Sequence, residues 1–297
     1  YSQVHPDEAM RTAGEVCERE VTVFVTDLNL NRDLYETFRG LDAANMDTDA
    51  KRLVERTLRD FRRAGVDKDE ATRKRLKELA DKQLEIGQKF DKNIRENVRS
   101  VTLDPAQLEG LPKDYRDSHP AGADGKVTLT TDYPDYIPFR TYAKNAPARL
   151  ALYTEYMRRG YPANDELLKQ LLAVRKEQAT LLGYKSWADY ITEDKMIGSA
   201  KNAQDFIDKI TAAADKRAKQ DLALLLARKQ KDDPKAKAVD QSENAYYEEL
   251  VKSEQFKFDS QEVRPYFEFG QTRDGLLAIT SRIFDVEYQA VPVGAAN

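Results

Sequence analysis

The chain has 297 residues, of which 34% are charged and 40% hydrophobic, and its formal net charge is −4. This composition is typical of a helix-rich globular protein, and the net negative charge argues against a nucleic-acid partner held by net charge. A single cysteine and two histidines exclude an internal disulfide and a cysteine-based zinc cluster. The longest clearly apolar run, Leu222 to Ala227, is too short for a membrane span.

Four helices are predicted in the first hundred residues, over residues 6–27, 31–40, 47–65 and 68–98. Asn31 can cap the second helix, and Asp47 or Thr48 the third, which Gly65 would end. The fourth would be a rod of roughly 46 Å at 1.5 Å per residue. Its apolar stripe consists of Leu76, Leu79, Ile86, Phe90, Ile94 and Val98.

The pattern changes between residues 104 and 147, where six prolines interrupt the helical periodicity. Asp124-Gly125 is a turn signal, and the alternation from Lys126 to Thr131 predicts a short strand. We therefore expect a small β element near residues 126–140.

Helical periodicity resumes afterwards and predicts helices over residues 148–159, 165–182, 187–193, 202–229, 244–252 and 275–284. Residues 229–240 are expected to form a solvated loop, and residues 285–288 could begin a strand. The predicted fold is mainly α, with long helices and helical hairpins. A weak internal division is expected near residues 104–147, with helical segments over 1–103 and 148–297.

Candidate metal ligands are few. His5 and Cys17 are twelve residues apart without a third ligand at a recognised spacing, so Cys17 is better explained as a small buried apolar residue. His119 follows Ser118 in what is predicted to be a surface loop. Adjacent residues rarely face each other correctly for a nucleophile and its base, which argues against a catalytic pair.

Other motifs have structural explanations that are stronger than the functional ones. Gly122 to Lys126 lacks the glycine spacing of a phosphate loop and predicts a hairpin turn. Asp47 and Asp49 lack the later ligands of a calcium loop, so helix capping explains them. The adjacent carboxylates Glu248 and Glu249 would point about 100° apart on a helix. The mixed charges of residues 67–99 indicate a solvated helix face.

Tyrosine is common, with 15 residues, and several tyrosines could line a peptide-binding surface. Half-buried aromatic packing with a solvated hydroxyl is the favoured interpretation. The residues concerned are Tyr133, Tyr136, Tyr184, Tyr190, Tyr246, Tyr247 and Tyr266. Residue chemistry alone reveals no catalytic constellation, and no catalytic, cofactor-binding or metal-binding residue is predicted in the chain.

An ordered set of short motifs nevertheless resembles the zinc oligopeptidases of the thimet oligopeptidase, neurolysin and oligopeptidase A group. The resemblance covers nearly the whole chain. One departure is Ser242-Glu243, where members of the group often have Trp-Asp. The motifs are Leu108 to Pro112, Asp124 to Leu129, Tyr133 to Pro138, Leu181 to Tyr184, Trp187 to Tyr190, Met196, Tyr246-Tyr247, Val263 to Phe267, Gly275 to Leu277 and Ile283 to Val286.

The resemblance implies a mechanism that this chain cannot perform alone. Such enzymes hold zinc with a His-Glu-x-x-His helix, in which both imidazoles face the metal and the glutamate acts as general base. The chain contains no His-Glu-x-x-His. We therefore expect an N-terminal portion whose helices form channel walls, with zinc bound in the full-length parent and none in this chain.

The expected partners are short peptide substrates and the missing C-terminal catalytic half, with no nucleic acid. The alternative is a non-catalytic helical scaffold, or a peptide-binding or protein-binding module. The compartment is not fixed by the sequence; a cytoplasmic location is favoured, and a secreted or periplasmic one after processing stays open.

Overall fold

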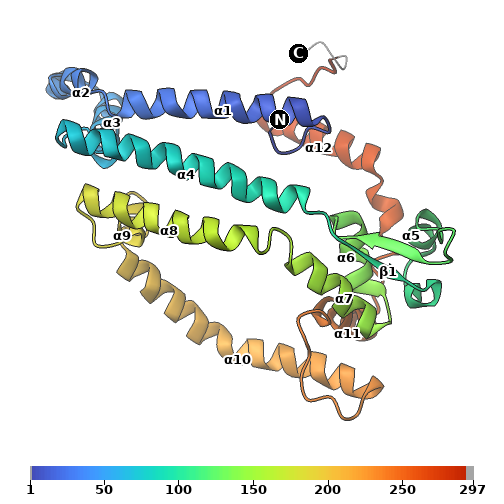
Figure 1. Cartoon of the computed structure of the whole chain (residues 1–297). Coiled ribbons are helices and arrows are strands. Elements are labelled where there is room, and N and C mark those ends of the chain that lie inside the picture. Colours follow the sequence, from blue (N-terminus) through green and yellow to red (C-terminus); the bar gives the residue numbers. More distant parts are fainter. Residues whose placement is uncertain (1, 292–297) are drawn as a thin grey trace. The chain divides into compact units, whose positions relative to one another are not determined.

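A computed structural model describes residues 2–291, except for the side chain of Ala43. The chain divides into two compact units: unit 1 comprises residues 1–139 and 143–219, and unit 2 comprises residues 140–142 and 220–297. Over the described residues the structure is mainly α with one two-stranded sheet, so the predicted fold class is confirmed (Figure 1). No helix among those residues is both long and apolar enough to cross a membrane.

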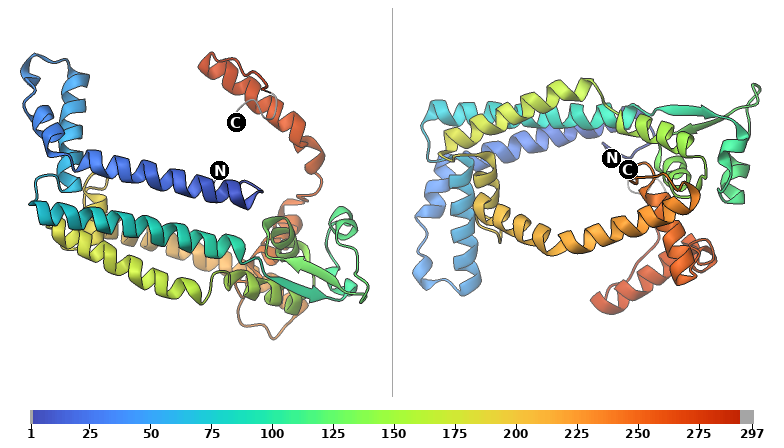
Figure 2. Two further views of the ribbon diagram at one scale, coloured as in Figure 1. Left: turned by 45° about the horizontal axis from the view of Figure 1, so that its top comes forward. Right: turned by 90° about the horizontal axis from the view of Figure 1, so that it is seen from below.

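Three helices of unit 1 lie side by side: α1 (Glu8–Asn29), α4 (Glu70–Glu96) and α8 (Ala163–Leu182), as Figure 2 also shows. Helix α4 packs along α8 and buries Leu76, Leu79 and Ile86 of the predicted stripe. Asn97 ends α4, so the exposed Val98 lies outside the helix. The 27 residues of α4 give a rod of about 40 Å.

A helical hairpin, α2 (Arg32–Arg39) and α3 (Thr48–Ala64), is joined by a 3₁₀ turn at Ala43–Asn45. The predicted caps are confirmed, because the side chain of Asn31 accepts the amide of Leu34 and that of Asp47 accepts the amide of Ala50. Tyr35, Phe61 and Val66 form the buried core of this hairpin. Gly65 ends α3 with φ +96°, a left-handed conformation that favours glycine.

The sheet pairs β1 (Ser100–Leu103) with β2 (Val127–Thr130) in antiparallel register, Ser100 opposite Thr130 and Leu103 opposite Val127. Strand β2 confirms the strand predicted over 126–131, whereas β1 was not predicted. A 3₁₀ turn (Pro105–Leu108) and the short helix α5 (Lys113–Ser118) connect the strands. Helix α7 (Ala146–Met157) packs against β1.

The segment after β2 corrects the sequence analysis. The β element does not continue toward residue 140, because Tyr133–Tyr142 forms helix α6. Pro134 lies in the first turn, where no intrahelical amide bond is required, so it favours this helix. Pro138 lies inside the helix and removes only one backbone hydrogen bond. Prolines that seemed to exclude helix are therefore compatible with a short one.

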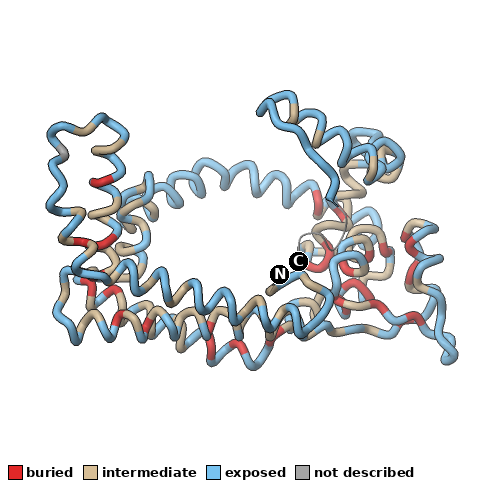
Figure 3. Tube along the Cα trace, turned by 90° about the horizontal axis from the view of Figure 1, so that it is seen from above, coloured by how far each residue is buried: buried red, intermediate tan, exposed pale blue. Residues whose placement is uncertain are grey.

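The remaining helices are α9 (Trp187–Thr192), α10 (Ala200–Asp232), α11 (Asn244–Phe256) and α12 (Phe269–Phe284), with a 3₁₀ turn at Arg264–Phe267 before α12. Helix α10 belongs to unit 1 up to Lys219 and to unit 2 beyond it. Residues 204–224 of α10 are all exposed, whereas buried residues occur along α4, α8, the sheet and the α6–α7 segment (Figure 3). The predicted strand at 285–288 is wrong: Asp285 ends α12 with φ +52°, and residues 286–291 form no strand.

Candidate functional site

The candidate metal ligands do not come together. His5 accepts the amide of Asp7 through Nδ1 at 3.1 Å. Cys17 is exposed, so its predicted burial is wrong, because its face of α1 does not pack on α4. Among the described residues, no three His, Cys, Asp or Glu side chains converge so that they could hold a metal ion. These side chains do not fit the zinc that the resemblance implies.

The structure does bring Ser118 and His119 together, although the sequence analysis expected neighbours not to face each other. Ser118 Oγ lies 3.2 Å from Nδ1 of His119. The same Nδ1 lies 2.7 Å from the carbonyl oxygen of Tyr115, which can only accept a hydrogen bond. Nδ1 therefore carries a proton and cannot serve as a base for Ser118, so the pair is not a nucleophile with its base.

Asp135 holds the other side of this imidazole. Its Oδ1 lies 3.0 Å from Nε2 of His119, and its Oδ2 accepts the amide and the hydroxyl of Thr130 at 2.8 and 2.7 Å. Burial raises the pKa of Asp135, but the hydrogen bonds from Thr130 and His119 outweigh it, and the net pKa is lowered. The network ties α5, β2 and α6 together. Asp135 was not predicted as a site residue, because its position in helix α6 has no local sequence signal.

Both loop candidates have structural roles, but the predicted hairpin turn is only partly right: Gly122 to Lys126 forms a turn within the long connection between β1 and β2, and it does not itself join two strands. Gly122 donates its amide to the Lys126 carbonyl at 2.8 Å, and Gly125 has φ +75°, so the segment is a tight turn before β2. Asp47 caps α3.

Tyrosines of α6 and α7 form an aromatic cluster in unit 1 together with an arginine. The rings of Tyr136 and Tyr156 stack with centroids 3.8 Å apart, and Cζ of Arg159 lies 4.0 Å from the Tyr156 ring centroid. Tyr133, 60% exposed, lies at the edge of the stack. A hydrogen bond from Tyr156 and another from Arg159 lower the pKa of Tyr133. The cluster thus presents a phenol beside a cation, and sequence analysis missed Tyr156 and Arg159.

Tyr184 and Tyr190 connect α3 to the α9 region. Their rings meet edge to face at 5.2 Å, and the guanidinium of Arg63 lies 4.6 Å from the Tyr190 centroid. Arg63 also donates to the Tyr190 carbonyl at 2.9 Å and forms an ion pair with Glu193. Burial, followed by the hydrogen bond to Glu193, raises the pKa of Tyr184 to about 12. Both rings are half-buried and pack on each other, and the Tyr184 hydroxyl bonds Glu193.

Unit 2 contains the other three tyrosines that were considered for peptide binding, Tyr246, Tyr247 and Tyr266. Tyr246 and Tyr247 meet edge to face at 5.2 Å, and Tyr247 is buried, whereas Tyr266 is 76% exposed. Just before the pair, Glu243 is largely buried and accepts a charge-assisted hydrogen bond from Lys229 at 2.6 Å. Ser242, also buried, bonds Asp240 through its amide and hydroxyl. The departure Ser242-Glu243 therefore supplies a satisfied polar core at the start of α11.

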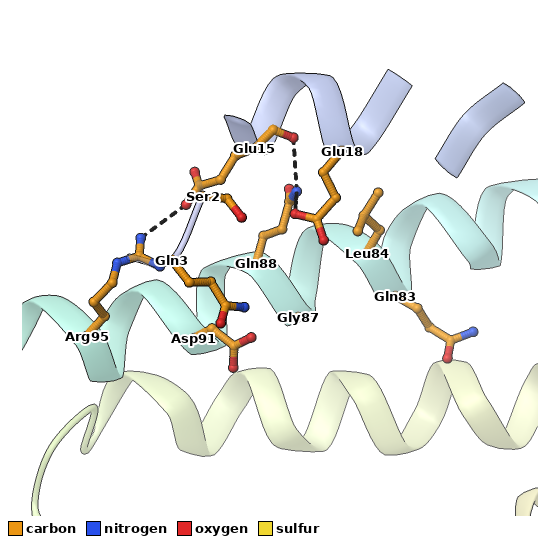
Figure 4. Close-up of a pocket in the computed structure, with 10 residues that line it drawn as sticks. All are labelled: Ser2, Gln3, Glu15, Glu18, Gln83, Leu84, Gly87, Gln88, Asp91 and Arg95. Atoms are coloured by element: carbon orange, nitrogen blue, oxygen red, sulfur yellow. Dashed lines mark hydrogen bonds and ion pairs between the residues drawn. The ribbon is translucent and has the colours of Figure 1, made fainter. Parts of the chain in front are cut away.

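A polar hollow of about 230 Å³ lies between α1 and α4 (Figure 4). Carboxylates of Glu15, Glu18 and Asp91 line it, and Arg95 forms an ion pair with Glu15 at 3.1 Å. Gln88 donates to the Glu15 carbonyl at 3.1 Å. The side chains in this hollow bond mainly to one another, which indicates a loosely packed helix interface.

The fold and these clusters thus describe a mainly α protein with aromatic surfaces and, over the described residues, no metal-binding set. Residues 139–294, more than half of the chain, match the model of Peptidase family M3, and the chain belongs to this family. The resemblance inferred from the motifs is confirmed.

Individual relatives match almost the whole chain. It is 28% identical to oligopeptidase A of Escherichia coli strain K12, over 93% of this chain and 43% of the relative. Saccharolysin of Saccharomyces cerevisiae is 25% identical, over 96% of this chain and 42% of the relative. Thimet-like oligopeptidase of Dictyostelium discoideum is 25% identical, over 96% of this chain and 45% of the relative. The chain therefore spans less than half the length of these relatives.

Proposed function

We propose that this chain is the N-terminal part of a zinc-dependent oligopeptidase that hydrolyses short peptides. In this proposal it contributes channel walls and substrate size selection, and it is inactive alone. The observation that carries the proposal is the family match over residues 139–294 in a chain without a His-Glu-x-x-His sequence.

The helices have properties that suit walls. Helix α4 is about 40 Å long, and α10, with 33 residues, about 50 Å. Long helices satisfy their own backbone hydrogen bonds, so one face can border a solvent-filled space at no cost in unpaired amides. Packing of α4 along α8 stiffens this part of unit 1. Stiff walls would admit an extended peptide and exclude a folded protein of larger cross-section.

Zinc chemistry is assigned to the remaining part of the parent. The metal would polarise the scissile carbonyl and acidify a bound water there. The present residues would restrict and orient the peptide. Action on short peptides, which the names of the relatives indicate for those proteins, is part of this proposal for the parent.

The first experiment compares the purified 297-residue chain with the longer parent on a quenched short peptide, with and without a zinc chelator. We expect chelator-sensitive hydrolysis by the parent and none by the chain. Chelator-sensitive turnover by the chain itself would overturn the proposed inactivity. A parent without such turnover would favour the alternative of a non-catalytic helical scaffold.

The second experiment tests size selection in the parent. One cleavable sequence is supplied as a free peptide and, separately, within an exposed loop of a folded host protein. We expect cleavage of the free peptide alone. A general protease that cleaves unfolded and folded hosts serves as the control for accessibility, and equal cleavage of both substrates by the parent would contradict the wall role.

A further inference from the structure

Over the described residues, helix α1 displays an apolar stripe whose members are all exposed. Met10, Cys17, Val21, Phe24 and Leu28 recur at intervals of seven, four, three and four residues, which places them on one face. Val21 is 55% exposed and Phe24 62%, and none of the 22 residues of α1 is buried. We call these five residues the α1 stripe.

The opposite side of α1 attaches to α4 through polar groups. Glu15 pairs with Arg95 at 3.1 Å and Asp27 with Lys77 at 2.5 Å, from side chains spread along both helices. Figure 4 shows this polar side, with the hollow between the helices. An amphipathic surface helix normally buries its apolar face and solvates its polar one. On α1 the ion pairs lie on the side toward α4 and the apolar stripe is exposed, which leaves the stripe accessible to a partner from outside unit 1.

The charge around the α1 stripe restricts its partner. Helix α1 carries five acidic and two basic side chains, a net charge of −3, and Glu18 and Glu20 flank the stripe on its two sides. A second copy of α1 packed on the same face would bring these acidic flanks together, which opposes pairing. Lysine or arginine beside an apolar core would complement them.

The length of the relatives indicates where such a partner could come from. The chain covers 43% of oligopeptidase A of Escherichia coli, so more than half of that protein lies outside the matched region. We propose that the α1 stripe is the docking face for a segment of the parent polypeptide outside these 297 residues. The segment has an apolar stripe bordered by lysine or arginine. This inference rests on the proposed function only in taking the chain as part of a longer family M3 protein.

Cys17 provides the test, because it is the single cysteine of the chain and lies within the stripe. Its alkylation by a maleimide is followed by mass spectrometry of the Cys17 peptide, in the native 297-residue chain and in the native parent. We expect alkylation at least about tenfold slower in the parent, because a docked face must open before it reacts. Equal rates would overturn the proposal.

Two matched variants make the test independent of the thiol. Val21→Asp changes the stripe, whereas Val16→Asp changes a valine of similar exposure, 52%, about 140° around the helix. In the parent, Val21→Asp is expected to lower the melting temperature and Val16→Asp to leave it nearly unchanged. In the 297-residue chain both should have the same small effect. Equal effects in the parent would contradict docking on this face.

The outcomes separate the docking from the enzymatic proposal. A parent that protects Cys17 but hydrolyses no peptide would keep the docking face and overturn the oligopeptidase function. A parent that hydrolyses peptides while Cys17 reacts freely would do the opposite. Protection that appears in the 297-residue chain alone and increases with its concentration would assign the face to a second copy and overturn the proposed occupant.

Discussion

Two glycines with the same backbone conformation allow packing to be separated from backbone strain. Gly65 ends α3 with φ +96°, and Gly183 ends α8 with φ +93°. A Cβ at Gly65 would lie 2.4 Å from Cδ1 of Leu76 and 3.0 Å from Cδ2 of Leu182, both in buried residues. A Cβ at Gly183 would meet nothing within 4 Å. Replacement by alanine therefore strains both sites but crowds only the first.

The magnitudes follow from these contacts. The left-handed conformation costs an alanine about 1–2 kcal/mol, which is the whole effect expected for Gly183→Ala. Displacing two buried leucines costs a further ~1–3 kcal/mol, so Gly65→Ala should lower the free energy of unfolding by ~2–5 kcal/mol. Gly87→Ala is an internal control of opposite sign. Gly87 lies within α4 with nothing near its added Cβ, so this change should stabilise by ~0.5–1 kcal/mol.

Thermal unfolding followed by far-ultraviolet circular dichroism measures all three variants. At this size about 1 kcal/mol corresponds to a shift of ~2–4 °C. We expect the melting temperature of Gly65→Ala to fall clearly below that of Gly183→Ala, and that of Gly87→Ala to rise above the wild type. Equal losses for Gly65→Ala and Gly183→Ala would refute the role assigned to the Leu76 and Leu182 contacts.

Three further predictions concern the ionisable groups. The pKa of Asp135 is lowered in the folded protein, so its carboxylate stabilises the fold above the unfolded-state pKa of about 4, and this stabilisation is lost as the pH falls through the folded-state pKa. The difference in melting temperature between wild type and Asp135→Asn should therefore shrink on acidification. A difference that stays constant with pH would contradict this. Glu193→Gln should lower the pKa of Tyr184 from about 12, as measured by ultraviolet titration with Tyr184→Phe as the reference. An unchanged titration midpoint would argue against the hydrogen bond between Tyr184 and Glu193. Lys229→Met leaves the Glu243 carboxylate without its cation and should lower the free energy of unfolding, measured in urea, by ~2–4 kcal/mol. The double variant Lys229→Met/Glu243→Met should recover part of this stability, and the absence of any recovery would mean that the two residues act independently.

Sequence periodicity located the long helices because their signals are local. Asn31 and Asp47 begin helices, and Gly65 ends one, through hydrogen bonds and a φ value that neighbouring residues determine. The apolar stripe of α4 was likewise predicted from its spacing, and its first members are buried where α4 packs on α8.

The missed features depend on contacts between distant segments. Strand β1 exists because Val101 pairs with Leu129, and such pairing has no local signature in a four-residue strand. The exposure of Cys17 could not be predicted, because apolar spacing shows that a face exists but not what covers it. The same holds for Tyr156, whose role depends on Tyr136 in a helix that prolines concealed. Family membership could be predicted because it depends on the order of several short motifs along the chain. The chemistry of single residues did not indicate it.

Zinc stoichiometry tests most directly the central proposal that these 297 residues form channel walls and leave the zinc site to the rest of a family M3 enzyme. The metal content of the purified 297-residue chain and of the longer parent is measured by elemental mass spectrometry after dialysis against zinc. We predict about one zinc ion per parent molecule, by the single-metal chemistry of such sites, and none retained by the chain. Stoichiometric zinc in the chain, or none in the parent, would contradict this account.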